Sequence, residues 1–383
     1  MDPTSRDSPH HQVLCLVADD EAADLCPSAI RYLQVGLIDE PIETVLVVPE
    51  TARALSLESG RTVMVTYRQV QWPLAHWARR NLIAEVHRRI RSLQADASIV
   101  VHAWSASSSL MAARLAEALG GELVLTVSDT AAMDSPEGSD VYSKAAALVA
   151  SSDHIRQAIE TTTVGTKILE TISPGVVATS GPAAFSNPQR APSLIFAGSL
   201  SADSGLEVLL HAVKLVLPHH PNLSTFVIGK GNAEGHFRQL VEAFDLGMDV
   251  TFTGRLDEWR AAIQAADIFC VPGGSRVFRE EPIQALATGL ATIVPQDTVC
   301  DGLIDQQTAL LFSPGDPASL AQRIRRLLED RAFARTIAAS GQAYARTHHS
   351  ISRMVAEYVE LYRRLDPRAK SLPMPAPDNQ PES

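Results

Sequence analysis

The stretch FAGSLSADSGLEVLLHAV, residues 196–213, reads as the end of a strand, a short turn and a helix. Its apolar residues run unbroken to the turn and then recur at the spacing of one helix face. In an open α/β sheet this geometry offers the N-terminus of a helix to an anion. The turn itself holds no basic residue and carries Ser199 and Ser204 instead. The stretch therefore predicts a Rossmann-like unit, and it leaves open whether that unit binds phosphate.

The same alternation of apolar runs and helical stripes extends through the chain on both sides of this stretch. The predicted strands are 13–18, 43–49, 61–67, 98–104, 121–127, 146–151 and 167–172, followed by 193–198, 224–229, 250–254, 267–272 and 291–295. These runs are rich in Val and Ile and are almost continuously apolar, which is typical of parallel strands buried on both faces. The pattern predicts an α/β protein of two doubly wound, Rossmann-like domains that face a cleft.

Composition shifts divide the chain into domains. Residues 173–192 hold four prolines and two glycines without any period, which predicts a linker. The full prediction is a disordered N-terminus (1–11), a first domain (12–172), the linker (173–192), a second domain (193–348), a C-terminal helix that packs back on the first domain (349–365) and a disordered tail (366–383).

Charge and cysteine usage restrict the class of protein. The net charge of −11 argues against a nucleic-acid partner. The four cysteines are scattered without a C-x-x-C pair, which favours a reducing cytoplasm over a disulfide framework or a zinc site. The N-terminal stretch has no apolar signal core, and no run approaches the ~20 apolar residues that cross a bilayer. We therefore expect a cytoplasmic protein.

Cations follow three of the first four predicted strands of the second domain. Lys230 follows the second strand, Arg255 follows the third, and the loop GGSRVFREE, residues 273–281, follows the fourth. Because parallel strands end at one edge of their sheet, these cations are expected to lie on one crest of the second domain. Cations beside glycines at this edge suit an anion, although polar loop ends alone also account for each residue singly.

The order of motifs between about residues 193 and 346 resembles the C-terminal domain of the family 4 glycosyltransferases. The matching segments are LIFAGSLSADSGLEVLLHAV, FVIGKGNAEGHFRQLVEAFDL, VTFTGRLDEWRAAIQAADIFCVP, IQALATGLATIVPQ and ALLFSPGDPASLAQRI. The first half matches weakly, mainly at VVHAWSASSSLMAARLA. The resemblance implies a retaining, metal-independent enzyme of the two-Rossmann-domain GT-B fold. Its substrate would be a nucleotide-sugar donor, linked to UDP or GDP, and no cofactor is implied.

The chain departs from this family's pattern where the chemistry would take place. The family's Arg and Lys in the first turn are replaced by Ser199 and Ser204. Its two glutamates, which contact the sugar and the ribose, are replaced by Arg276 and Gln284. The family's histidine after the strand at 121–127 is replaced by Ser128, and the loop ADDEAADLCPS after the first strand has no glycine.

Neighbouring loops offer partial compensation, so we expect a rearranged donor site. Arg276 and Arg279 place cations on the same crest, and a carboxylate of Glu280 or Glu281 can stand near the sugar. The predicted donor-binding residues are Gly198, Ser199, Ser204, Lys230, Arg255, Arg276, Gln284 and Asp301. The predicted catalytic residues are Glu280, Glu281 and His102, the last placed at the cleft edge of the first domain. A structural, hydrogen-bonded role is the alternative for His102.

Three functions remain open from the sequence. The first is sugar transfer from the nucleotide-sugar donor to an unknown acceptor, which is a glycan, a lipid-linked molecule or a small molecule. The second is a degenerate, inactive glycosyltransferase that serves as a binding or scaffold protein. The third is a sugar-phosphate epimerase on the same architecture, for which the first domain offers only His102 and the cluster Asp19, Asp20 and Glu21.

The segment HWARRNLIAEVHRRIRSLQ, residues 76–94, predicts a helix with an apolar stripe and a basic face. Such a helix suits peripheral contact with anionic lipid at the inner face of the membrane, although a charged face is more often simply solvated.

Overall fold

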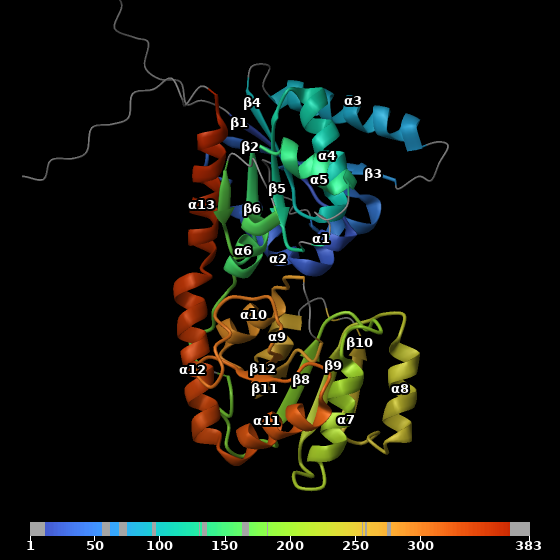
Figure 1. Cartoon of the computed structure of the whole chain (residues 1–383), viewed down its shortest axis with the longest axis vertical. Coiled ribbons are helices and arrows are strands. Elements are labelled where there is room, and N and C mark those ends of the chain that lie inside the picture. Colours follow the sequence, from blue (N-terminus) through green and yellow to red (C-terminus); the bar gives the residue numbers. More distant parts are fainter. Residues whose placement is uncertain are drawn as a thin grey trace, which may run out of the picture.

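The computed structural model describes residues 12–55, 62–68, 75–93, 97–129, 131, 136–162, 168–181, 183–254, 256, 259–273 and 277–367. Two α/β domains lie one above the other, the first in blue to green and the second in green to orange (Figure 1). Each domain is built on a parallel sheet whose central strands are almost fully buried, as their continuous apolar character predicts.

The first sheet has seven strands in the order β3-β2-β1-β4-β5-β6-β7. These strands are β1 (Gln12–Val17), β2 (Ile42–Pro49), β3 (Thr62–Tyr67), β4 (Ser98–Ala103), β5 (Glu122–Val127), β6 (Ala147–Ala150) and β7 (Leu169–Thr171). The strand order reverses between β1 and β4, so the crevice outside their carboxyl ends is a natural place for a ligand.

The second sheet has six strands in the order β10-β9-β8-β11-β12-β13. These strands are β8 (Ser193–Ala197), β9 (Ser224–Ile228), β10 (Val250–Gly254), β11 (Ile268–Cys270), β12 (Ala291–Pro295) and β13 (Leu310–Phe312). Here the order reverses between β8 and β11. The loops that follow these two strands are the serine-bearing turn and the loop that leads to Glu280 and Glu281.

Helices cover both sheets. Those of the first domain are α1 (Asp20–Leu25), α2 (Pro27–Gly36), the short 3-10 helix η1 (Glu50–Leu55), α3 (Ala75–Leu93), α4 (Ala106–Leu119), α5 (Pro136–Lys144) and α6 (Asp153–Thr162). Those of the second are α7 (Leu206–Val216), α8 (Glu234–Ala243), α9 (Trp259–Ile263), α10 (Glu281–Thr288), α11 (Pro317–Glu329) and α12 (Arg331–His348). The last helix is α13 (Ile351–Leu365).

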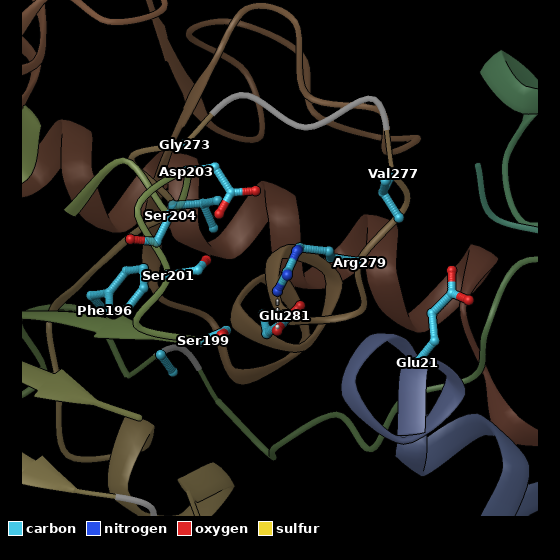
Figure 2. Close-up of a pocket in the computed structure, with 13 residues that line it drawn as sticks. Glu21, Phe196, Ser199, Ser201, Asp203, Ser204, Gly273, Val277, Arg279 and Glu281 are labelled. Atoms are coloured by element: carbon cyan, nitrogen blue, oxygen red, sulfur yellow. Dashed lines mark hydrogen bonds and ion pairs between the residues drawn. The ribbon is translucent and has the colours of Figure 1, made fainter. Parts of the chain in front are cut away.

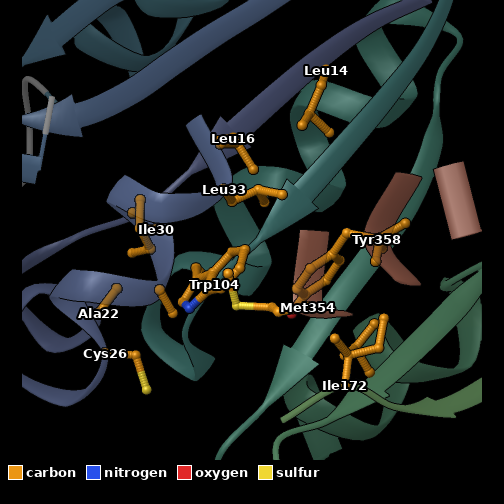
Figure 3. Packing of buried hydrophobic residues seen from close by; sticks show 14 of the residues in the cluster. Leu14, Leu16, Ala22, Cys26, Ile30, Leu33, Trp104, Ile172, Met354 and Tyr358 are labelled. Carbon is orange, nitrogen blue, oxygen red and sulfur yellow. The ribbon is translucent and has the colours of Figure 1, made fainter. Parts of the chain in front are cut away.

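Helix α13 leaves the second domain and packs on the first. It continues the line of α12 along one side of the molecule and contacts α2 (Figure 1). Its buried face places Met354 and Tyr358 in one apolar cluster with Leu14 and Trp104 (Figure 3). The side-chain amide of Gln12 also donates a hydrogen bond to the Tyr362 carbonyl over 2.9 Å. The chain end thus ties the two domains together.

The fold class predicted from the sequence is confirmed, and every predicted strand overlaps an observed one. The edge strand β13, which is only three residues long, was not predicted from the sequence. So short an apolar run carries too little periodicity to be recognised before its partner β12 is known.

Candidate donor site

Two adjoining pockets lie at the carboxyl ends of the second sheet and face the first domain. The turn pocket, of about 220 Å³, is bounded by the turn after β8 and includes Ser199, Ser201, Asp203 and Ser204. The lysine pocket, of about 340 Å³, is bounded by Lys230 and by the start of α9. Gly198, Ser199, Arg279 and Glu281 line both pockets, so the two form one continuous cleft.

Close backbone contacts shape this cleft. Gly205 begins α7 with φ +72°, and a Cβ atom there would stand 2.3 Å from the Gly273 nitrogen. Gly229 has φ +149°, and a Cβ atom there would stand 1.9 Å from the Gly198 carbonyl oxygen. Side chains at these positions would push the loops apart, so the glycines bring the loops after β8, β9 and β11 together.

Arg279 is the central cation of the cleft. Its guanidinium lies between the serine turn and Glu281, and its Nη1 is 3.3 Å from a Glu281 carboxylate oxygen (Figure 2). A hydrogen bond from Ser201 lowers the pKa of Asp203 below its ordinary value, and the nearby Arg279 lowers it further. Among the described residues that line the two pockets, the cations are Arg279 and Lys230.

The first domain supplies the opposite wall of the cleft. Glu21 of α1 lines the turn pocket, and Figure 2 shows it across the cleft from the serine turn. The Ser107 backbone N–H, at the start of α4, donates to a Glu21 carboxylate oxygen over 3.1 Å, and the Ser107 hydroxyl contacts Glu21 as well. Asp19 accepts a hydrogen bond from Ser105 over 2.8 Å. The N-terminus of α4 therefore holds this acidic loop in place.

Glu280 connects the two domains. It is 2% exposed and accepts a hydrogen bond over 2.7 Å from the hydroxyl of Ser28 in α2. Beside it, the Phe278 N–H donates to the Ser128 carbonyl over 2.8 Å. Ser128 is itself buried, with its hydroxyl 2.8 Å from that of Ser151. Glu280 lines the lysine pocket, so this carboxylate belongs to the cleft and to the domain contact at once.

The placement of His102 at the cleft edge was wrong. His102 is 0% exposed inside the first domain, because β4 is a central strand and its second-last residue points into the core. One ring nitrogen lies 2.8 Å from the Tyr362 hydroxyl and the other 2.8 Å from the Thr126 hydroxyl. Burial lowers the pKa of His102 to about 3. This environment supports the structural alternative and not the predicted catalytic role.

Two predicted donor-binding residues lie away from both pockets. Gln284 is 3% exposed, and its side-chain amide donates to the Val177 carbonyl of the linker over 3.0 Å, because α10 turns this face towards the linker. Asp301 accepts a hydrogen bond from the Asp153 N–H over 2.9 Å at the start of α6. Burial raises the pKa of Asp301. Both side chains serve contacts between segments of the chain and do not reach the cleft described here.

The remaining predicted residues divide into two groups. The structure brings together Gly198, Ser199, Ser204, Lys230, Glu280 and Glu281 around the cleft. Arg255 and Arg276 lie outside the described residues, so their roles stay predictions. Asp203 and Trp259 were not predicted as site residues, and Glu21 was predicted only for the epimerase alternative. Asp203 follows β8, Trp259 follows β10 and Glu21 follows β1. These positions after the carboxyl ends of strands were the sequence feature that could have indicated them.

Two further predictions concern metals and membranes. Within the described residues, no group of three or more His, Cys, Asp or Glu side chains is arranged to hold a metal ion. None of the described helices has both the length and the apolar character needed to span a bilayer. In α3, Arg88 and Arg89 both pair with Glu85, which neutralises part of the basic face. Membrane contact through 76–94 stays a prediction.

The architecture of two facing Rossmann-like domains with a cleft between them is that of the GT-B glycosyltransferases. HepE of Anabaena, solved in complex with UDP and glucose, superposes with a TM-score of 0.76 at 15% identity, over 92% of this chain and 100% of that chain. Sucrose-phosphate synthase of Thermosynechococcus elongatus superposes with a TM-score of 0.74 at 18% identity, over 93% of this chain and 99% of that chain.

Sequence matches to glycosyltransferases fall on the second domain. Residues 191–330 match the family model described as Glycosyl transferases group 1. Sulfoquinovosyl transferase SQD2 of Arabidopsis thaliana is 30% identical over 146 residues, which are 37% of this chain and 27% of that protein. Phosphatidyl-myo-inositol mannosyltransferase of Mycolicibacterium smegmatis is 26% identical over 148 residues, 37% of this chain and 38% of that protein. The chain thus spans less than half of the length of these curated relatives.

The resemblance to glycosyltransferases seen in the sequence is therefore confirmed, with the match to the Glycosyl transferases group 1 model falling on residues 191–330. The narrower assignment to family 4 is compatible with these matches and stays a prediction.

Proposed function

We propose that this protein transfers a sugar from a nucleotide-sugar donor to an acceptor, with retention of anomeric configuration and without a metal ion. The observation that carries the proposal is the cleft where the strand order of the second sheet reverses, with Arg279 and Lys230 beside the serine turn. Matches to glycosyltransferases over this domain, and a related fold solved with UDP and glucose, support the same function.

The cleft residues suit a diphosphate leaving group. Negative charge grows on the diphosphate as the glycosidic bond breaks, and fixed cations in a sheltered cleft stabilise that charge. Lys230 supplies a mobile positive charge from the lysine pocket, and Arg279 supplies a planar guanidinium that Glu281 orients. The hydroxyl of Ser199, which lines both pockets, donates a hydrogen bond to a phosphate oxygen but does not neutralise it. We therefore assign the role of the family's turn cations to Arg279 and Lys230.

Calorimetric titration of the full chain with UDP, GDP and ADP tests this assignment. We expect one nucleotide to bind at micromolar level. Arg279→Ala or Lys230→Ala should weaken its binding about 10- to 100-fold, because each variant loses one charge-assisted contact. Arg238→Ala is the matched control, because this exposed arginine pairs with Glu234 on α8. Failure of a folded sample to bind any of the three would instead favour the degenerate scaffold protein. Product anomer analysis and activity in EDTA then test retention and metal independence.

A further inference from the structure

The described residues that line the turn pocket carry more negative than positive charge. Three carboxylates line it, namely Glu21 of α1, Asp203 of the serine turn and Glu281 of α10. Arg279 is the cation among the described lining residues, and it pairs with Glu281 over 3.3 Å. Glu21 and Asp203 are thus left as two carboxylates that face each other across the cleft (Figure 2).

Both carboxylates are held where they stand. Glu21 accepts a hydrogen bond from the Ser107 backbone N–H over 3.1 Å, so α4 fixes its position from within the first domain. Asp203 accepts a hydrogen bond from the Ser201 side chain, and this hydrogen bond lowers its pKa. Side chains held in this way cannot easily move aside when a negatively charged group enters the pocket.

The orientation of the donor follows from the contrast between the two pockets, and this step depends on the proposed function. Among the described residues of the lysine pocket, the two cations Lys230 and Arg279 balance the two carboxylates Glu280 and Glu281. The apolar side chains of Leu256 and Trp259 line the same pocket, which suits a base and its phosphates. The turn pocket adjoins it at Arg279 and opens towards Glu21 of the first domain. The sugar therefore lies in the turn pocket, where carboxylates accept hydrogen bonds from its hydroxyl groups.

We propose that the cleft selects nucleotide sugars whose transferred sugar carries no negative charge, and that Glu21 and Asp203 are the specificity-determining residues. A carboxylate or sulfonate on the sugar would stand beside two like charges and would lose the hydroxyl that either carboxylate could bind.

Titration with a matched pair of donors tests the proposal. UDP-glucose and UDP-glucuronate differ only at C6, where a hydroxymethyl group is replaced by a carboxylate. For the full chain at pH 7.5 we expect UDP-glucuronate to bind at least about tenfold more weakly than UDP-glucose. In Glu21→Gln/Asp203→Asn the two donors should bind within about threefold of each other. UDP alone is titrated into both proteins as the reference for the nucleotide site. If the nucleotide proves to be guanosine, GDP-mannose and GDP-mannuronate make the same comparison.

Controls separate a local effect from one of net charge. Glu122→Gln/Glu242→Gln removes the same charge from exposed positions outside the two pockets and should keep the tenfold preference. Asp203→Asn alone changes an exposed side chain, so it keeps the test usable if the Glu21 variant folds poorly. Equal binding of the two donors by the natural chain, or an unchanged preference in the double variant, would overturn the proposed selection against charged sugars. Either result would leave the proposed nucleotide site standing. Absence of nucleotide binding overturns the donor site and the selection together.

Discussion

The buried imidazole of His102 makes the stability of the protein depend on pH. Burial lowers its pKa to about 3, whereas an imidazole in the unfolded chain takes up a proton near pH 6.5. The folded state therefore binds fewer protons than the unfolded state between these two values. The stabilising contribution is fully present above pH 6.5 and is lost as the pH falls towards 3. Burial also lowers the pKa of His349, to about 4, which adds a loss of the same sign.

Replacing His102 isolates its share of this dependence. His102→Gln removes the titrating group and keeps the hydrogen-bonding capacity towards Tyr362 and Thr126. We expect the free energy of unfolding of the natural chain to fall between pH 7.5 and 5.5 by about 1.4 kcal/mol more than that of the variant. Urea unfolding at the two pH values measures the difference. An identical fall in both proteins would show that His102 does not titrate on unfolding.

For single residues, the sequence predicted which residue types line the cleft better than it predicted where each side chain points. It placed Ser199, Lys230 and Glu281 correctly on one crest, because carboxyl ends of parallel strands share an edge. It could not show that Gln284 faces the linker or that Glu280 reaches Ser28, since both contacts depend on how distant segments pack. The buried position of His102 likewise follows from the central place of β4 in the sheet.

Among the secondary-structure elements, the start of α7 is held by close backbone packing. Gly205→Ala would place a Cβ atom 2.3 Å from the Gly273 nitrogen, at a residue whose φ is +72°. We expect a loss of about 2–4 kcal/mol, because strain at positive φ adds to a backbone clash that no side-chain rotation relieves. Thermal unfolding of the purified variant measures this loss, and weaker nucleotide binding should accompany it.

Gly235 provides the matched control for this substitution. It lies within α8, and a Cβ atom there would meet nothing within 4 Å. Gly235→Ala is therefore expected to stabilise the protein by about 0.5–1 kcal/mol, since alanine favours a helix over the unfolded chain. Equal effects of the two substitutions would contradict the role assigned to Gly205.

The elements themselves were largely predictable, because their apolar periodicity is strong. The continuous runs of β1 and β8 and the stripe of α7 can be read without their partners. The contact between Gly205 and Gly273 joins loops 68 residues apart, so no local pattern could predict it. The close fit of these two loops becomes apparent only once β8 and β11 are known to be neighbours.

At the scale of the whole molecule, the two domains share one buried cluster. Phe278 of the second domain is 0% exposed and lies in the same cluster as Cys26 and Ile30 of the first. Hydrogen bonds between described residues cross the same boundary, among them those from Ser28 to Glu280, from Phe278 to Ser128 and from Asp153 to Asp301. Together with α13, these contacts favour unfolding of the two domains as a single cooperative unit.

Phe278→Ala tests whether this shared cluster couples the two domains. We expect the free energy of unfolding to fall by about 3–5 kcal/mol. Because the lost packing lies at the contact between the domains, calorimetry should show two unfolding transitions in place of one. Phe237→Ala is the matched control, since Phe237 is equally buried but lies in a cluster confined to the second domain. Phe237→Ala should lower the stability of the second domain without changing the contact between the two domains. A single transition in Phe278→Ala would show that α13 and the hydrogen bonds across the boundary couple the domains without this side chain.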